Sequence, residues 1–234
     1  GDPLYTLVNP VDDALMEITH VLRGEDLLSS TPRQLAMYAA LAQIAVGDGS
    51  TPRFGHLPYV MGEGNKKLSK RDPQSSLNLY REEGYLPEGL LNYLALLGWS
   101  AGADLEFFSP TQLAELFDIG RVQPNPARFD PKKCLAINGD WIRHITPADL
   151  ARRMLPYLEA AGAISGTPTA EQQSLIDSAV PLVQERMETL RGGAEQLRFL
   201  LLPESDFSVD REDAERVLTE EARPTLQSSY DALA

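Results

Sequence analysis

The spacing of hydrophobic positions changes along the chain and predicts a small mixed region followed by a long helical one. In the first 50 residues, short apolar runs over 4–8 and 18–22 are typical of buried strands, and helical spacing follows Thr31-Pro32, with Thr31 as the expected N-cap. Strand–helix alternation favours an α/β layer with parallel strands. Because two strands are too few for such a sheet, we expect its other strands upstream of Gly1.

After an apolar stretch over 53–61 and a turn over 62–65, the pattern becomes helical. Ser109 and Thr146 begin sequences of the capping-box type, and Pro181 is expected to kink or break the helix that contains it. The predicted helices cover 76–84, 87–97, segments after Ser109 and Thr146, 170–190, 192–202, 211–219 and 223–233. The fold class is therefore mostly α with a small α/β part, with boundaries near 50 and 143.

Composition excludes several classes of protein. The chain has 234 residues, of which 43% are hydrophobic and 24% are charged, and this excludes a wholly disordered chain. The longest apolar runs span only a few residues, far fewer than the roughly 20 that a membrane span needs. The single cysteine, Cys134, excludes an intramolecular disulfide and a multi-cysteine zinc site, and is expected to be a buried small hydrophobe.

The net charge of −13 argues against a generic nucleic-acid binder, but the charge is unevenly distributed. Residues 171–234 have a net charge of −8, typical of solvated helix faces. Basic residues cluster at Lys66, Lys67, Lys70 and Arg71, and again at Arg121, Arg128, Lys132, Lys133 and Arg143. Because charges beyond a Debye length of roughly 8 Å are screened, these clusters can bind phosphates despite the negative total.

The strongest chemical signal is the sequence Lys-Lys-Leu-Ser-Lys-Arg over 66–71, directly after a glycine-rich turn. Two lysines three positions apart, with a hydroxyl between them, suit the charge that develops on a pyrophosphate leaving group. The spacing differs from that of a P-loop. Taken alone, a basic loop of this kind is more often a solvated turn.

The second signal is Arg23, which follows an apparently buried strand at the end where α/β folds place ligand groups. An arginine there can hold a carboxylate, although a structural pair with Asp12, Glu25 or Asp26 is locally at least as frequent. The three histidines lack partners at metal-ligand spacing, so no metal role is expected for them. They are His20, His56 and His144.

The two signals belong to one ordered set of motifs, and together they resemble the bacterial glutamyl-tRNA synthetases of class I. The set comprises Tyr5, Asn9, Asp12-Asp13, the segment 18–26, Thr31-Pro32-Arg33-Gln34, His56-Leu57-Pro58, Lys67-Leu68-Ser69-Lys70-Arg71 and the segment 84–100. The resemblance is highly specific over 1–100 and moderate over 101–145, through Ala127-Arg128-Phe129-Asp130. Beyond 145 only the helical character agrees.

The resemblance implies an enzyme that joins glutamate and ATP into glutamyl-adenylate and transfers glutamate to the 3′ end of its tRNA. It assigns catalytic roles to Lys67, Ser69 and Lys70, and ATP binding to Asp26, Val60, Lys67, Leu68, Ser69, Lys70 and Arg71. Glutamate binding is assigned to Tyr5, Asn9 and Arg23. It also implies ATP as substrate with Mg²⁺, no zinc, no membrane partner, a monomeric parent and a cytoplasmic location.

The HIGH signature and the acceptor-stem insertion of the family do not occur in the sequence. We therefore expect 1–50 to be the second half of the nucleotide-binding domain, 51–143 a connecting domain with the lysine loop, and 144–234 the start of the anticodon-binding domain. Such a fragment is expected to be inactive alone. The alternatives are a non-catalytic tRNA-binding module that uses the two basic clusters and, more distantly, a paralogue that glutamylates a queuosine base in tRNA.

Overall fold

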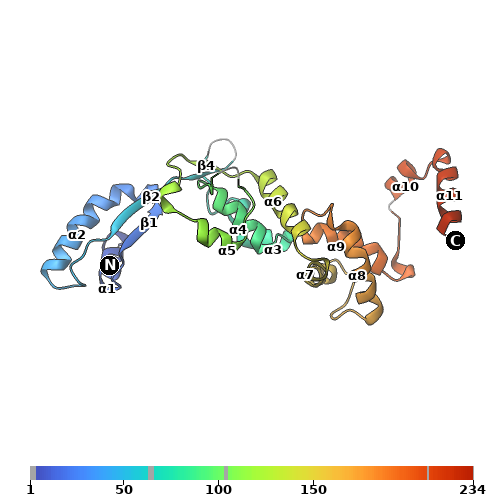
Figure 1. The fold of residues 1–234 in the computed structure, drawn as a ribbon, viewed down its shortest axis with the longest axis horizontal. Helices are drawn as coiled ribbons and strands as arrows, with labels where there is room; N and C mark the ends of the chain where they lie inside the picture. Colours follow the sequence, from blue (N-terminus) through green and yellow to red (C-terminus); the bar gives the residue numbers. More distant parts are fainter. Residues whose placement is uncertain (1–3, 63–65, 103–104, 210, 234) are drawn as a thin grey trace. The chain divides into compact units, whose positions relative to one another are not determined.

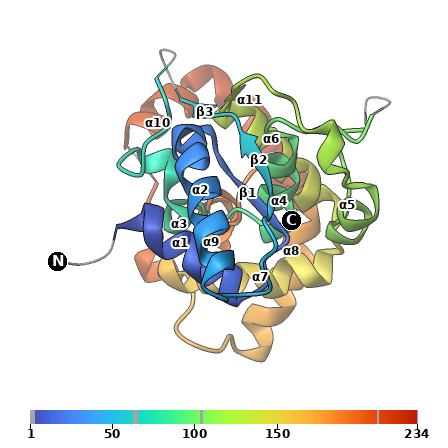
Figure 2. The same cartoon turned by 90° about the vertical axis from the view of Figure 1, so that its left-hand side faces the viewer.

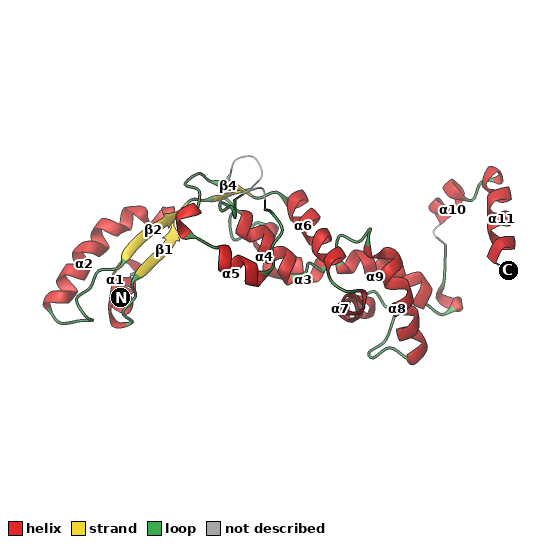
Figure 3. Cartoon of the chain, viewed as in Figure 1, coloured by secondary structure: helices red, strands yellow, loops and turns green. Residues whose placement is uncertain are grey.

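The computed structural model describes residues 4–62, 66–102, 105–209 and 211–233, in two compact units over 1–144 and 145–234. Most of these residues are helical, and strand pairing is confined to two small parallel sheets (Figures 1 and 3). The predicted fold class, mostly α with a small α/β part, is confirmed. Of the predicted turn over 62–65, residues 63–65 lie outside the described part. None of the described helices combines the length and apolar character that a bilayer crossing requires.

The strand predicted over 4–8 is wrong, because Tyr5–Leu15 forms helix α1. Asp12 and Asp13 lie inside it. Its buried positions, Pro10 and Ala14, are four residues apart and share one face of this helix. The apolar run at 4–7 remains largely exposed, so it supplies none of the burial that would select a strand.

The first sheet pairs β1 (His20–Gly24) with β2 (Arg53–Leu57) in parallel. The strand predicted over 18–22 is present two residues later, and its pairing is parallel as expected, but its partner β2 lies in the apolar stretch over 53–61 and not over 4–8. Helix α2 (Thr31–Gln43) runs beside this pair in the two views of Figures 1 and 2. The pairing joins segments from both sides of residue 50.

Thr31 is not the N-cap of α2, contrary to the sequence prediction. A short 3-10 helix over Glu25–Ser30 runs directly into α2, so Ser30 already has helical dihedral angles and caps nothing with its side chain. The buried residues of α2 are Gln34 and Tyr38, so the buried face of this helix is more polar than its apolar spacing predicted. The Thr31 hydroxyl is therefore available for other contacts.

The rest of the first unit is built on four helices and a second sheet. Strand β3 (Val60–Met61) pairs in parallel with β4 (Ala127–Arg128). Helix α3 (Leu77–Glu83) ends at Gly84, whose φ of 83° is the left-handed conformation that glycine tolerates best. The other helices are α4 (Pro87–Leu96), α5 (Pro110–Leu116) and α6 (Pro131–His144), and α5 begins with the predicted capping box at Ser109.

Helices α4 and α6 pack against each other through a core that includes buried amides. Asn92 donates to the Glu106 carbonyl at 2.8 Å and accepts from the Trp141 indole at 3.1 Å. Asn138 accepts from the Leu86 backbone at 2.8 Å. Cys134 is buried as predicted, and burial raises the pKa of its thiol to about 12, so it acts as a neutral packing group.

In the second unit, α7 (Pro147–Ala160), α8 (Ala170–Gln184) and α9 (Leu190–Leu201) pack pairwise around buried aliphatic residues. These residues include Leu150, Met154, Leu158, Ile176, Val180 and Leu197. Helices α10 (Arg211–Val217) and α11 (Arg223–Leu233) follow, and no described side chain in them is buried. Pro181 lies inside α8, which continues to Gln184, so it does not end this helix.

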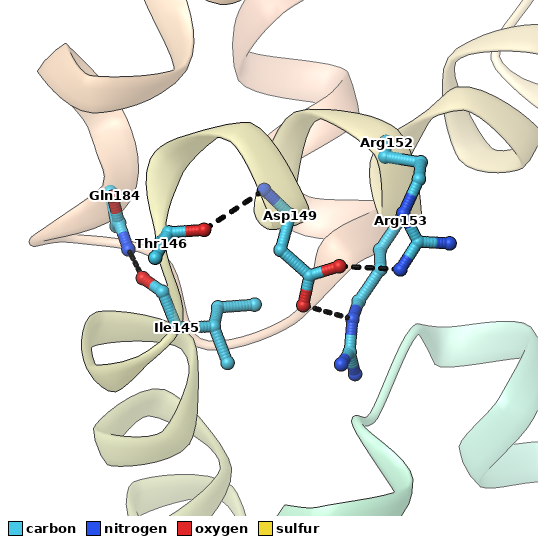
Figure 4. A network of polar contacts seen from close by, with 6 residues as sticks. All are labelled: Ile145, Thr146, Asp149, Arg152, Arg153 and Gln184. Carbon is cyan, nitrogen blue, oxygen red and sulfur yellow. Dashed lines mark hydrogen bonds and ion pairs between the residues drawn. The ribbon is translucent and has the colours of Figure 1, made fainter.

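A polar network holds the start of α7 (Figure 4). The Thr146 hydroxyl accepts from the Asp149 backbone at 3.3 Å, as predicted for a helix cap, and Gln184 donates to the Ile145 carbonyl at 2.8 Å. The Asp149 carboxylate accepts from Arg153 at 2.9 Å and also from Arg152. Hydrogen bonds from these two arginines hold the pKa of Asp149 below its usual value.

We expect Asp149→Asn to destabilise the second unit by about 1 kcal/mol at pH 7, because two partly exposed ion pairs and a charge near a helix N-terminus are lost. The folded-state pKa is lowered, so this stabilisation is present above the unfolded value of 3.8 and disappears as pH falls below it. Hydrogen exchange of α7 amides at pH 7 and pH 3.5 measures the difference. Asp213→Asn on α10 is the exposed control, and an equal effect there would contradict the prediction.

Candidate active site

Arg23 is placed by the register of the first sheet. The parallel pairing sets Arg23 on β1 directly beside His56 on β2. Its Nε lies 3.4 Å from Nε2 of His56, and its guanidinium carbon is 5.2 Å from the centre of the Phe54 ring. A one-residue shift in register would send these side chains to opposite faces of the sheet. The strand pairing therefore determines where this cation lies.

The structure brings Tyr5, predicted to bind glutamate, to Arg23. The Tyr5 hydroxyl accepts from Nη1 of Arg23 at 3.4 Å, and Tyr5 is about half exposed. Nη2 of Arg23 donates to the Thr31 hydroxyl at 2.8 Å and to the Leu27 carbonyl at 3.3 Å. The alternative of a structural ion pair between Arg23 and Asp12, Glu25 or Asp26 is not what the described contacts show.

Asn9 is the third residue predicted to bind glutamate, and polar side chains of α1 and α2 hold it in place. It donates to Asp13 at 2.9 Å and accepts from Gln34 at 3.3 Å. Tyr38 donates to the same Asp13 carboxylate at 3.0 Å. Burial and that carboxylate raise the pKa of Tyr38, so it stays a neutral donor. Gln34 keeps one buried oxygen without a partner among the described residues.

The sequence prediction missed these supporting residues. Asp13 pairs with a residue four positions earlier on α1, and Gln34 and Tyr38 lie four apart on α2. Polar residues at this spacing share one helix face, so the signal was present. This spacing defines a polar face on each helix, but it does not show that the faces of α1 and α2 contact each other.

The lysine loop is held by the second sheet. The Leu68 backbone donates to the Val60 carbonyl at 2.9 Å, and Lys67 forms a bridge with Met61, on the edge of β3. Predicted ATP-binding residues Val60 and Leu68 are therefore neighbours. Strand β4 pairs with the same β3, so the loop has a fixed base in the fold.

The tip of the loop is a tight turn from Ser69 to Asp72. The Asp72 backbone donates to the Ser69 carbonyl at 3.0 Å, and the Asp72 carboxylate accepts from the Ser69 backbone at 2.6 Å. The Ser69 hydroxyl accepts from the Arg71 backbone at 3.1 Å, which leaves its proton free to donate. Lys70 and Arg71 occupy the two central turn positions, are exposed, and form no ion pair with a described side chain.

Lys67 points back to Asp26, the predicted ATP-contacting acid. Its ammonium lies 3.1 Å from the carboxylate and 4.1 Å from the centre of the Tyr59 ring. The hydrogen bond from Lys67 lowers the pKa of Asp26. Gly24 stands close by, since a Cβ there would lie 2.5 Å from the Asp26 carboxylate.

The Arg23 cluster (Tyr5, Arg23, Thr31 and His56) and the lysine loop (67–71) thus lie at the same end of the β1–β2 pair. Arg23 is the next-to-last residue of β1 and Asp26 follows that strand, while His56 is the next-to-last residue of β2 and Tyr59 follows it. The carboxyl ends of parallel strands are where α/β folds place ligand groups. The arrangement combines a cation suited to a carboxylate with exposed cations suited to phosphates.

In the described part of the chain, no three histidine, cysteine, aspartate or glutamate side chains lie close enough to hold a metal ion. His20 contacts the Thr19 hydroxyl, and His144 packs against Phe107 and Trp141. His56 belongs to the Arg23 cluster. Each of the three histidines therefore has a contact other than a metal.

The second basic cluster is mostly occupied by internal contacts. Arg121 donates to the Ala101 carbonyl at 2.8 Å, Lys133 pairs with Glu106 at 2.6 Å, and Arg143 pairs with Asp140. A cavity of about 380 Å³ lies between the end of α4 and residues 123–130, and Arg128 and Lys133 of this cluster are among the residues that line it. These cations are therefore less available to phosphates than their spacing predicted.

Comparison with known families assigns both units. Residues 1–135 match the family described as tRNA synthetases class I (E and Q), catalytic domain, and residues 149–234 match the anticodon binding domain family. The catalytic-domain match covers more than half of the chain.

Curated relatives and solved structures agree with this assignment. A glutamate–tRNA ligase from Saccharopolyspora erythraea is 58% identical over 233 residues, and one from Streptomyces coelicolor is 60% identical over 207 residues. The alignments cover 100% and 88% of this chain but 46% and 42% of the relatives. The crystal structure of a glutamate tRNA ligase from Elizabethkingia meningosepticum, in complex with its amino acid, superimposes with a TM-score of 0.74 at 27% identity, covering 97% of this chain and 46% of that one. The chain spans about half the length of these proteins.

Proposed function

The chain belongs to the class I (E and Q) tRNA synthetases, and we propose that the protein containing it attaches glutamate to its tRNA. In the first step a carboxylate oxygen of glutamate attacks the α-phosphorus of ATP, and pyrophosphate leaves. In the second step a ribose hydroxyl at the tRNA 3′ end attacks the carbonyl of the adenylate, and AMP leaves. ATP enters as its magnesium complex.

The observation that supports this proposal is the convergence of two different cationic sites at one end of the β1–β2 pair. Arg23 and the Tyr5 hydroxyl form the glutamate side, together with Asn9. The lysine loop forms the ATP side. Adenylation requires a carboxylate and a triphosphate to lie side by side, and holding them together can lower the activation barrier by several kcal/mol.

On the ATP side, the residues divide by chemistry. Lys67, Lys70 and Arg71 supply positive charge to the phosphates, and the Ser69 hydroxyl has a proton to donate. Val60 and Leu68 give the apolar surface proposed for the adenine. Asp26 holds Lys67 at 3.1 Å and exchanges this contact for ATP when the nucleotide binds.

Glutamate charging of bacterial tRNA tests the proposal. A protein of the relatives' full length that contains this chain should charge tRNA for glutamate, and the chain alone is assayed beside it. Charging with glutamine or aspartate in place of glutamate would contradict the substrate assignment. tRNA binding without charging by the full-length protein would favour the alternative of a non-catalytic docking module.

Salt dependence gives a prediction for the tRNA contact itself. The logarithm of the tRNA affinity should fall linearly with the logarithm of the salt concentration, by roughly 0.7–0.9 for each phosphate neutralised. Because the Lys132 side chain is exposed while Arg121 is bound to the Ala101 carbonyl, Lys132→Ala should reduce the slope more than Arg121→Ala. Fluorescence titration at 50–300 mM salt measures both. A slope in Lys132→Ala equal to that of the parent would show that Lys132 contacts no phosphate.

The match to an anticodon-binding family over 149–234 supports aminoacylation over glutamylation of queuosine, because the resembling paralogue ends soon after the lysine loop. An unmodified tRNA transcript distinguishes the two activities. The proposed enzyme charges it, whereas a queuosine-modifying enzyme has no acceptor base on such a transcript.

A further inference from the structure

The Arg23 guanidinium has five N–H donors, and four of them are used within the structure. Nε donates to His56, and Nη2 donates to Thr31 and to the Leu27 carbonyl. One N–H of Nη1 faces the Tyr5 hydroxyl at 3.4 Å. Among the described residues this leaves one N–H of Nη1 without a partner, and it is the donor that remains for a ligand. A carboxylate can therefore approach only from the Nη1 side, next to Tyr5.

Thr31 and His56 close this arrangement by contacting each other. The Thr31 hydroxyl lies 3.0 Å from Nε2 of His56, and the same Nε2 lies 3.4 Å from Nε of Arg23. A hydroxyl has one proton, and an arginine has no acceptor. Because Nε2 accepts from the Nε–H of Arg23, this nitrogen carries no proton, and the Thr31 hydroxyl donates its own proton to it. His56 must then carry its ring proton on Nδ1.

The three side chains come from three separate elements. Arg23 lies near the end of β1, His56 lies beside it on β2, and Thr31 is the first residue of α2. The Phe54 ring lies under the guanidinium, and the His56 ring stacks on the same ring at 6.4 Å. Each contact restrains a different part of a long and otherwise flexible side chain.

We propose that Thr31 and His56 are positioning residues for the amino-acid substrate: they hold Arg23 so that its remaining N–H and the Tyr5 hydroxyl meet one carboxylate of glutamate. This inference rests on the proposed function and deepens it. Neither residue touches the substrate, and both act through Arg23. Their loss therefore weakens glutamate binding and leaves ATP binding and the chemical step close to unchanged.

Paired substitutions at each position test this in the full-length protein, with tRNA present. Thr31→Val removes the hydroxyl at constant shape, and Thr31→Ser restores it. His56→Leu removes the acceptor, and His56→Gln restores an acceptor at a similar reach. His20→Leu, an exposed histidine on the same sheet, is the control.

Thr31→Val and His56→Leu should each raise KM for glutamate about tenfold, the order expected for one lost hydrogen bond to a charged group. KM for ATP and kcat should change less than threefold, and Thr31→Ser, His56→Gln and His20→Leu should remain within threefold of the parent. Equal changes in both KM values, or no rescue by serine, would overturn the proposal. If the parent itself does not charge tRNA with glutamate, the proposed function fails and the inference fails with it, whereas a parent that charges while Thr31→Val and His56→Leu leave KM for glutamate unchanged overturns the inference alone.

Histidine tautomers give a second measurement that needs no activity. In protein labelled with ¹⁵N-histidine, the ring signals of His56, assigned by their loss in His56→Gln, should show an unprotonated Nε2 and a protonated Nδ1 in the neutral ring. Thr31→Val should weaken this preference, because only the Arg23 Nε–H at 3.4 Å then donates to Nε2. A proton on Nε2 in the parent would overturn the inference even where His56→Leu fails to fold.

Discussion

Replacing Lys70 with alanine in the full-length protein should slow glutamyl-adenylate formation by about 10²–10³-fold, which corresponds to about 3–4 kcal/mol of lost transition-state stabilisation. Lys70 occupies the exposed tip of the Ser69–Asp72 turn and forms no ion pair with a described side chain. Its charge is therefore available to a ligand and is not used in an ion pair with a described side chain. The turn itself is formed by backbone and side-chain contacts of Ser69 and Asp72, so the loop should keep its shape without Lys70.

Glutamate-dependent exchange of pyrophosphate into ATP, with tRNA present, measures this effect. Lys70→Arg retains the charge and should recover part of the rate, although an arginine places it differently. Arg53→Ala removes an exposed cation from β2 and is the control for net charge. A loss below threefold for Lys70→Ala, with substrate affinities unchanged, would exclude the assigned role.

Arg23→Lys should raise KM for glutamate about 10²-fold while KM for ATP changes less than threefold. A lysine ammonium is a single point of charge, so it cannot reach Thr31, His56 and Leu27 and also face Tyr5. The substitution therefore removes the planar set of guanidinium donors. Thr31 and His56 then no longer have a guanidinium to hold in place. The change exceeds that expected for Thr31→Val because the ligand contact itself is altered.

Steady-state kinetics with each substrate varied in turn measure the two constants for Arg23→Lys. Asn9 and Tyr5 remain in place in this variant, so some glutamate binding should persist. An equal loss of affinity for glutamate and ATP would indicate a folding defect and contradict the assignment. Thermal unfolding monitored by circular dichroism separates these outcomes.

Local signals in the sequence were sufficient for most of the helical architecture. The capping box at Ser109 and the cap at Thr146 act within a few residues, and each is found where it was predicted. The order of the motifs pointed to the same family that residues 1–135 match. Interactions of such short range can be predicted from the sequence alone.

The misplaced elements are those whose conformation depends on distant partners. The apolar run at 4–8 has the composition of a strand, but it lies in α1, whose contacts with α2 are made by Asn9 and Asp13. Thr31 has the sequence of an N-cap, but the preceding 3-10 helix makes that cap unnecessary. Propensity could not decide either case, because tertiary contacts outweigh a few tenths of a kcal/mol per residue.

The candidate site divides in the same way. The residue types that could bind a carboxylate and phosphates, Arg23 and the lysine loop, were recognisable from the sequence because charge and spacing are local properties. The contacts that hold Arg23 and Lys67 in place could not be recognised from the sequence. Thr31, His56 and Asp26 make these contacts across 8, 33 and 41 positions of the chain. Only the parallel register of β1 and β2 brings Arg23 beside His56, and hydrogen bonds require that proximity within about 3.5 Å.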